Sequence, residues 1–183
     1  MKNMLMLISD GFEEIEALGT VDILRRCGVQ TQICSVTGSR QIQSSRNIHL
    51  LCDRLLEDSP IQEEAWDGLV LPGGQPNADH LRDDRRVIEL TDRFYRAGKL
   101  CCAICAAPIV LERAGLLKGK TVTSYPGCLE REQDCNFVEQ AAVTDGQLIT
   151  GRGPGAAEAF AFQIVRALGL SEKAKEVRSA MLF

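Results

Sequence analysis

The chain has 183 residues, of which 45% are hydrophobic and 25% charged. This size and composition suit one compact globular domain spanning 1–183. A net charge of −4, with no basic run longer than a pair, argues against a nucleic-acid-binding surface. No apolar segment approaches the roughly 20 residues that span a bilayer, and acidic residues follow the short N-terminal apolar stretch at once. We therefore expect no membrane association, no signal peptide and a cytoplasmic location.

Eight cysteines raise the question of a disulfide framework. The chain is long, core-rich and without an export signal, so we expect its thiols to be reduced. Cys102 and Cys105 match a CxxC redox motif, but residues three apart on a strand lie about 10 Å apart, beyond the roughly 7 Å limit for the Cα atoms of a disulfide. No second pair has zinc-ligand spacing, and we expect neither a metal nor another cofactor.

The first half of the chain alternates predicted strands and helices. The apolar run 4–8 predicts a strand, and apolar residues at helical spacing over 13–27 predict a helix that ends at Gly28. Further strands are predicted over 30–36 and 68–71. Between them, 41–51 is compatible with a hairpin or an edge excursion, and 55–65 with a short helix or a turn. A helix is then predicted over 87–97.

The second half begins with a short buried run, 100–104, which predicts a parallel strand, and a helix over 109–114 with Pro108 in its first turn. A strand is predicted over 121–123, while 129–140 stays ambiguous. The segment 142–150 resembles a hairpin, and helices over 156–168 and 172–181 close the chain. This alternation predicts an α/β doubly wound, flavodoxin-like fold, in which helices cover both faces of a mostly parallel sheet.

Cys105 lies at the predicted corner between the strand 100–104 and the helix that follows. Small neighbours surround it, as in a nucleophile elbow. The start of the helix offers unpaired N–H groups and a partial positive charge, both of which favour thiolate over thiol. We predict that Cys105 is reactive, whereas Cys101 and Cys102, inside the strand, are interpreted as small core residues.

Other turns are predicted at the same edge of the sheet, where doubly wound proteins bind ligands. The turn after the first strand carries Glu13, Glu14 and Glu16, more carboxylates than helix capping requires, so one of them is expected to face a ligand. The Gly73-Gly74 turn can present backbone N–H groups to an anion, although alone it is interpreted as an ordinary turn. Tyr125 follows the strand 121–123 at the same edge.

Four segments resemble the signature motifs of the ThiJ/PfpI superfamily: GFEEIE at 11–16, LPGG at 71–74, AICAAP at 103–108 and RGPG at 152–155. The resemblance extends from residue 4 through the closing helix. Within the superfamily, the sequence is most similar to the branch of the Parkinson-associated protein deglycase and its bacterial ThiJ relatives. Four motifs in the right order make this resemblance specific.

The resemblance implies roles for individual residues. Cys105 corresponds to the catalytic thiol and Glu16 to the carboxyl group hydrogen-bonded to it. The turn Gly73-Gly74, through the Gly74 N–H group, and the Ala106 N–H group correspond to the donors around the developing oxyanion. A homodimer is also implied, with Arg26 and Arg46 at positions near the dimer interface and pocket.

The chain departs from the family pattern at two positions. Ala106 stands where the protease-like branch has a histidine, and Tyr125 stands where much of the deglycase branch has one. The Tyr125 hydroxyl can orient a substrate oxygen but is a poor general base near neutral pH, and a packed aromatic is the alternative interpretation. His49 and His80 lie outside the motifs and are interpreted as structural or surface residues.

The implied function is that of a cysteine-dependent, cofactor-independent enzyme acting on small α-oxoaldehydes such as methylglyoxal, or on glycated proteins. Cys105 adds to the aldehyde and Glu16 moves a proton between the adjacent carbons. The alternative is an oxidative-stress sensor or redox-regulated chaperone in which Cys105 is oxidised to sulfenic and then sulfinic acid. A thiol peptidase or amidase is less favoured because the histidine is missing. Whether Cys128 and Cys135 guard the crevice or only pack stays open.

Overall fold

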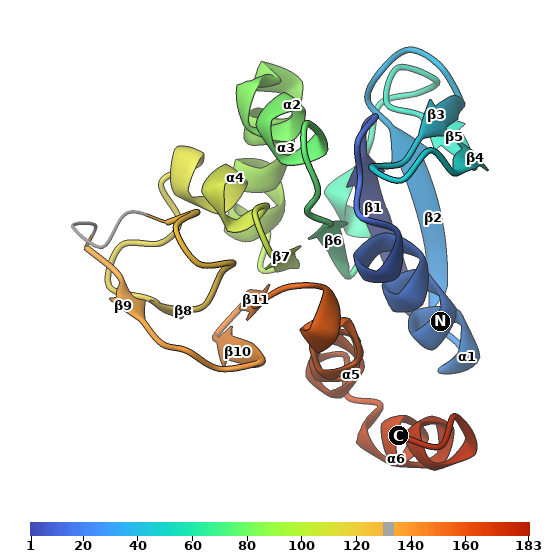
Figure 1. Cartoon of the computed structure of the whole chain (residues 1–183), viewed down its shortest axis with the longest axis vertical. Coiled ribbons are helices and arrows are strands. Elements are labelled where there is room, and N and C mark those ends of the chain that lie inside the picture. The colour runs from blue at the N-terminus through green and yellow to red at the C-terminus, as the bar shows by residue number, and fades with distance from the viewer. Residues whose placement is uncertain (130–133) are drawn as a thin grey trace.

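A seven-stranded sheet forms the centre of the molecule in the computed structural model, which describes residues 1–129 and 134–183 (Figure 1). The strands run in the order β10 (Ala142–Asp145), β11 (Leu148–Gly151), β7 (Leu100–Ile104), β6 (Gly68–Leu71), β1 (Asn3–Ile8), β2 (Gln30–Ser35) and β5 (Arg54–Leu55). All neighbours pair in parallel except β10 and β11, which are antiparallel. The predicted α/β fold with a mostly parallel sheet is confirmed.

The strand β1 shows why the sheet is covered on both faces. Met4, Met6 and Ile8 belong to one apolar cluster, while Leu5 and Leu7 belong to the other, and all five side chains are fully buried. Successive side chains of a strand point to opposite faces, so a continuous apolar run requires a helical layer on each side.

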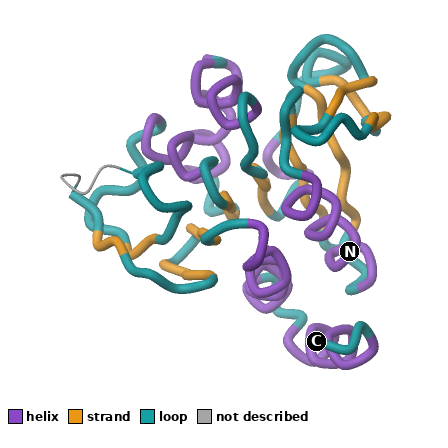
Figure 2. Tube along the Cα trace, viewed as in Figure 1, coloured by secondary structure: helices purple, strands orange, loops and turns teal. Residues whose placement is uncertain are grey.

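The helices supply these two layers (Figures 1 and 2). On the side of Met6 pack α1 (Thr20–Arg26), α5 (Ala157–Ala167) and α6 (Ser171–Ala180), and on the side of Leu5 pack α2 (Asn77–Asp83), α3 (Arg85–Arg96) and α4 (Pro108–Arg113). The last helix docks through Ala174 and Val177, as its sequence requires.

The helical predictions need correction at three points. The helix predicted over 13–27 is a π-helical turn, Ile15–Gly19, followed by α1. The helix α2 was not predicted, because only Ala78 and Leu81 give its seven residues an apolar face. The helix α3 begins at Arg85, two residues before its predicted start, because the Asp84 side chain caps it by accepting the Arg86 N–H at 2.9 Å.

The structure also defines several segments for which the sequence allowed more than one interpretation. The region 41–51 is a hairpin of β3 (Gln41–Gln43) and β4 (His49–Leu51), and 55–65 contains a 3₁₀ turn, Glu63–Ala65, rather than an α-helix. The strand predicted over 121–123 is β8 (Thr121–Val122), which pairs in parallel with β9 (Asn136–Phe137). In the ambiguous segment 129–140, residues 130–133 lie outside the described residues. Within 1–129 and 134–183, no helix has the length and apolar character needed to cross a bilayer.

Candidate active site

Cys105 occupies the corner between β7 and α4, as predicted. Its φ of 64° lies in the left-handed region, which costs a residue with a side chain about 1–2 kcal/mol. Two hydrogen bonds hold this backbone in place: the Cys105 N–H donates to the Gly151 carbonyl at 2.9 Å, and the Tyr125 N–H donates to the Cys105 carbonyl at 2.8 Å. The side chain is 9% exposed, so the thiol lies at the edge of the interior.

Glu16 is fully buried beside this corner. Its Oε2 atom accepts the Gly73 N–H at 2.9 Å, and its own backbone N–H donates to Oε2 of Glu13 at 2.8 Å. Oε1 is buried without an ordinary hydrogen bond within the described chain, and the remaining polar interaction of the carboxyl group is with the Cys105 thiol. The structure therefore places the predicted carboxyl group at the predicted thiol.

Gly73 is the point at which the two side chains meet. A Cβ atom on this glycine would lie 2.7 Å from both the Cys105 Cβ and the Glu16 Oε2, so those two atoms are at most 5.4 Å apart. A Cβ on Gly74 would lie 2.4 Å from both the Gly11 carbonyl oxygen and the Glu13 nitrogen. The turns that follow β1, β6 and β7 therefore meet around Gly73 and Gly74.

Both members of this pair hold their protons more tightly than usual. Burial raises the pKa of Glu16 to about 7, and the charge of Glu13 adds to this rise. Burial, together with the Glu16 carboxylate, raises the pKa of the Cys105 thiol, while the Ala106 N–H lowers it. This corrects the expectation that the helix start favours the thiolate, because burial and like charge outweigh it. A thiolate then requires the proton to reside on Glu16.

The other two glutamates of the acidic cluster have structural partners. Glu13 holds the backbone of Glu16, as described above. The Glu14 carboxylate accepts hydrogen bonds from the Ser44 hydroxyl, from the Ser45 hydroxyl at 3.2 Å and from the Arg46 N–H at 2.7 Å. Burial raises the pKa of Glu14, but these hydrogen bonds outweigh it and lower the pKa overall. Only Glu16 faces the thiol.

Tyr125 lies beside the Cys105 corner, and its contact with a substrate stays a prediction. Its backbone contacts Cys105, but its half-exposed ring lies over Gly153, where an added Cβ would be 3.3 Å from Cδ2. The ring lines a groove of about 500 Å³ together with Arg152 and Pro154. Within the described residues, its hydroxyl makes no hydrogen bond to Cys105 or Glu16.

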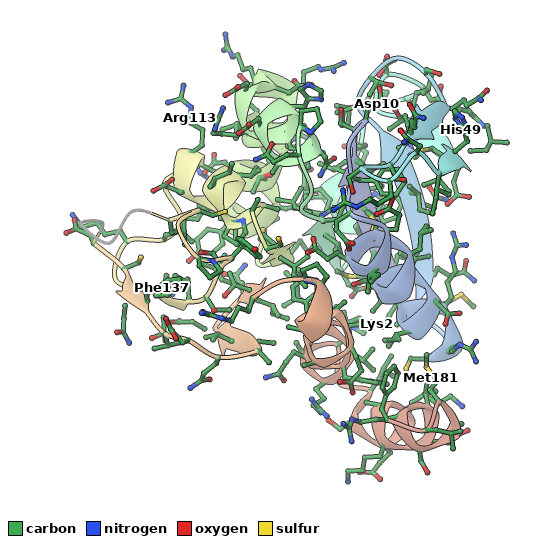
Figure 3. The ribbon with its side chains drawn as sticks, viewed as in Figure 1. Lys2, Asp10, His49, Arg113, Phe137 and Met181 are labelled. Atoms are coloured by element: carbon green, nitrogen blue, oxygen red, sulfur yellow. The ribbon has the colours of Figure 1, made fainter. Side chains whose placement is uncertain are left out.

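The remaining predicted residues lie outside this pair. The Arg26 guanidinium contacts Asp22 on α1, and the exposed Arg46 meets Glu14 through its backbone. His80 lies with Nδ1 2.9 Å from the Ser9 hydroxyl, and His49 is exposed on β4 at the outer edge of the molecule (Figure 3). In the part of the chain that the structure describes, no group of three or more His, Cys, Asp or Glu residues is placed to hold a metal ion.

Asn77 is a site-building residue that the sequence reasoning missed. Its buried amide donates to the Pro72 and Gly73 carbonyls at 2.7 and 3.0 Å, and its Oδ1 accepts the Ser9 N–H at 2.7 Å. It thereby ties the turn after β1 to the turn after β6. The sequence feature that could have indicated the start of α2 is an asparagine directly after Pro76, because asparagine is common where helices begin.

Known proteins resemble this chain over almost its whole length. The family model described as "DJ-1/PfpI family" matches residues 2–167. The chain is 34% identical over 183 residues to Protein dj-1beta of Drosophila melanogaster, covering 99% of this chain and 97% of the relative. It is also 34% identical to the Parkinson disease protein 7 homolog of Danio rerio over 185 residues, covering 99% and 97%.

A solved structure gives the same result. The crystal structure of a cysteine-to-alanine mutant of the DJ-1 superfamily protein STM1931 from Salmonella typhimurium superposes with a TM-score of 0.92. The two chains are 33% identical, and the match covers 100% of this chain and 99% of the other. The chain belongs to the DJ-1/PfpI family, which confirms the ThiJ/PfpI resemblance.

Proposed function

We propose that the chain is a cysteine-dependent, cofactor-independent enzyme that acts on reactive α-oxoaldehydes or their glycation adducts. The observation that carries this proposal is the pairing of Cys105, at a left-handed corner, with a buried Glu16 whose pKa is about 7. A group with a pKa near the working pH can both give and take a proton during one reaction.

The reaction of methylglyoxal illustrates how the pair would work. With the proton on Glu16, the Cys105 thiolate attacks the aldehyde carbon, and Glu16 protonates the resulting oxyanion to give a hemithioacetal. The Glu16 carboxylate then removes the proton from that carbon, which gives an enediolate, and returns it to the neighbouring carbon. The hydroxyl proton of the hemithioacetal passes to the former ketone oxygen, and a thioester results. Water hydrolyses the thioester to lactate and releases the thiol.

The backbone supports the charged steps. The Ala106 N–H already acts on the Cys105 sulfur, and Gly74 follows the residue that touches both reacting side chains. We assign the Ala106 and Gly74 N–H groups to the oxyanion, because preformed donors stabilise charge as it develops. Tyr125, from its groove, would contact the rest of the substrate. With a glycated protein, the Cys105 thiolate would displace the amine from the aldehyde carbon, and the amine would leave with a proton from Glu16, which gives the same hemithioacetal.

Steady-state conversion of methylglyoxal to lactate without glutathione tests the proposal. The reduced protein should turn over, whereas Cys105→Ser and Glu16→Gln should both lose activity. Cys135→Ser is the matched control, because Cys135 is electrostatically coupled to Glu112 rather than to the Cys105 pair. Absence of turnover by the reduced wild-type protein, or full activity of Cys105→Ser, would contradict the proposal.

A redox sensor or redox-regulated chaperone is the second candidate function. Its supporting observation is the same buried Glu16, because a protonated carboxyl group donates a hydrogen bond to a sulfinate as well as to a thiolate. A sensor needs no turnover, so the methylglyoxal assay separates the two. A peptidase or amidase is less favoured, because Ala106 occupies the position after the nucleophile.

We also propose a homodimer. Ile15, on the π-helical turn, and Ile48 and Leu51, on the β3–β4 hairpin, are exposed apolar side chains. The hairpin contacts the chain just before the π-helical turn, where the Ser45 N–H donates to the Phe12 carbonyl at 2.8 Å. An exposed apolar face of this kind is typical of an interface. Leu51→Asp should shift the sedimentation of the protein toward the monomer, whereas Leu182→Asp, at an exposed C-terminal site, should not.

A cytosolic location completes the proposal. All eight cysteines are free, and a reducing compartment keeps both buried and reactive thiols in that state.

A further inference from the structure

Cys128 lies next to the reactive corner, and the proposed reaction leaves it without a role. The Tyr125 N–H donates to the Cys105 carbonyl at 2.8 Å, and the Cys128 N–H donates to the Tyr125 carbonyl at 3.1 Å. This chain of two hydrogen bonds fixes the turn that carries Cys128 against the residue that carries the nucleophile. Cys128 also packs on the apolar cluster that contains Ala106, the residue after Cys105.

The charges of the two thiols show the same proximity. Cys128 is the one cysteine of the described chain whose charge acts on Cys105. Burial raises the pKa of Cys128, and the charges of Asp79 and Glu16 add to this rise. Two thiols therefore lie near one carboxyl group.

Access and position distinguish Cys128 from the other cysteines. Six of the eight cysteines, including Cys105, are buried, while Cys128 and Cys135 are partly exposed. Cys135 is electrostatically coupled to Glu112 instead of Cys105. Cys128 is therefore the partly exposed cysteine that lies near Cys105.

We propose that Cys128 is a resolving thiol for Cys105, and that a hydroperoxide converts the two residues into a reversible intramolecular disulfide. This inference rests on the reactive Cys105 of the proposed function. The Cys105 thiolate attacks the terminal peroxide oxygen, the O–O bond breaks, and the leaving alkoxide or hydroxide takes a proton, which gives Cys105 sulfenic acid. The Cys128 sulfur then attacks the Cys105 sulfur, an S–S bond forms, and water leaves.

The electrons balance over the two steps. The two thiols together lose two protons and two electrons. The hydroperoxide takes them up and gives one molecule of alcohol, or of water when it is hydrogen peroxide, and one further molecule of water. A dithiol reductant would restore both thiols by exchange through a mixed disulfide. The resolving step competes with a second peroxide, which would otherwise carry Cys105 on to the sulfinic acid.

Peroxide treatment of the full-length reduced protein tests this inference. Hydrogen peroxide is added in increasing equivalents, free thiols are alkylated, and the products are measured by intact mass and peptide mapping. The wild-type protein and Cys135→Ser should lose two hydrogens, yield a peptide that links residues 105 and 128, and recover with dithiothreitol. Cys128→Ser and Cys128→Ala should instead gain two oxygens at Cys105, with a sulfinate yield on the order of tenfold higher than wild type.

Two results would overturn the inference: an equal sulfinate yield at Cys105 in wild type and both Cys128 variants, or a linked peptide that joins Cys105 to another cysteine. Methylglyoxal turnover of the reduced variants keeps this question separate from the proposed function. Turnover should be unchanged in Cys128→Ser, so an inactive wild type refutes the enzyme, whereas an active wild type without the 105–128 link refutes only the resolving role.

Discussion

The Oε2 atom of Glu13 accepts the backbone N–H of Glu16 at 2.8 Å. This bond satisfies one of the free donors at the start of the helical segment and fixes the residue that faces the thiol. The charge of Glu13 also raises the pKa of Glu16. One side chain therefore sets both the position and the proton affinity of its neighbour.

Glu13→Gln separates these two effects. The amide oxygen can still accept the Glu16 N–H, but the negative charge is lost, so the pKa of Glu16 should fall. In the wild-type protein, alkylation of Cys105 by iodoacetamide should accelerate as the pH rises through about 7, where the pair loses its first proton. The inflection should move to lower pH in Glu13→Gln and stay in place in the control Glu64→Gln. An unchanged or higher inflection in Glu13→Gln would be evidence against this coupling.

Glu16→Gln should change the pH dependence of stability. The folded pKa of Glu16 is raised from 4.5 to about 7, so the native state binds the proton more tightly than the unfolded state does. The contribution of Glu16 to stability is therefore greatest below pH 4.5 and declines as the pH rises to about 7, by about 3 kcal/mol at 1.36 kcal/mol per pKa unit. The free energy of unfolding, measured in urea across this range, should lack this decline in Glu16→Gln. Parallel curves for the two proteins would refute the assignment.

Gly73→Ala should damage the site directly. The new methyl group would lie 2.7 Å from atoms of both Cys105 and Glu16, so we expect a loss of about 1–3 kcal/mol of stability and a loss of turnover. Gly155→Ala is the matched control, because no heavy atom lies within 4 Å of its added Cβ, and its effect should stay within about 0.5 kcal/mol. Urea denaturation and the methylglyoxal assay measure the two quantities, and equal behaviour of both variants would exclude the steric explanation.

Glu14→Ala should loosen the β3–β4 hairpin. The substitution removes the acceptor for the Ser44 and Ser45 hydroxyls and for the Arg46 N–H, at a cost of about 1–3 kcal/mol. Amide hydrogen exchange over 44–48 should accelerate, while exchange in β1 should not. The exposed Glu64, substituted by alanine, should change neither quantity. If amide hydrogen exchange over 44–48 stays as slow in Glu14→Ala as in the wild-type protein, other contacts hold the hairpin.

Much of the fold follows from local patterns. The apolar runs of β1, β6 and β7 identify the sheet, and Pro108 marks the start of α4 because its missing N–H has no partner to lose there. The corner at Cys105 follows from these two neighbours. The convergence of Glu16 with Cys105 follows from the rule that loops at the carboxyl ends of parallel strands meet.

Other features depend on contacts between distant residues, which no local pattern reveals. The helix α2 has a weak apolar face of its own and is held by Asn77 across 68 residues of sequence to Ser9. The different roles of Glu14 and Glu16 depend on hydrogen bonds from Ser44 and Gly73, which are distant in the sequence. The direction of the Cys105 pKa shift depends on burial, which outweighs the helix start.

The backbone at Cys105 is one that glycine adopts without penalty. If Cys105 reacts as we propose, chemistry and stability make opposite demands at this position: glycine would relieve the backbone cost, and the reaction requires the sulfur. In a homologue that no longer catalyses the reaction, the single substitution Cys105→Gly would increase the stability of the fold. Glycine at position 105 in a relative would accordingly mark a protein that has abandoned the thiol and kept the fold for another purpose.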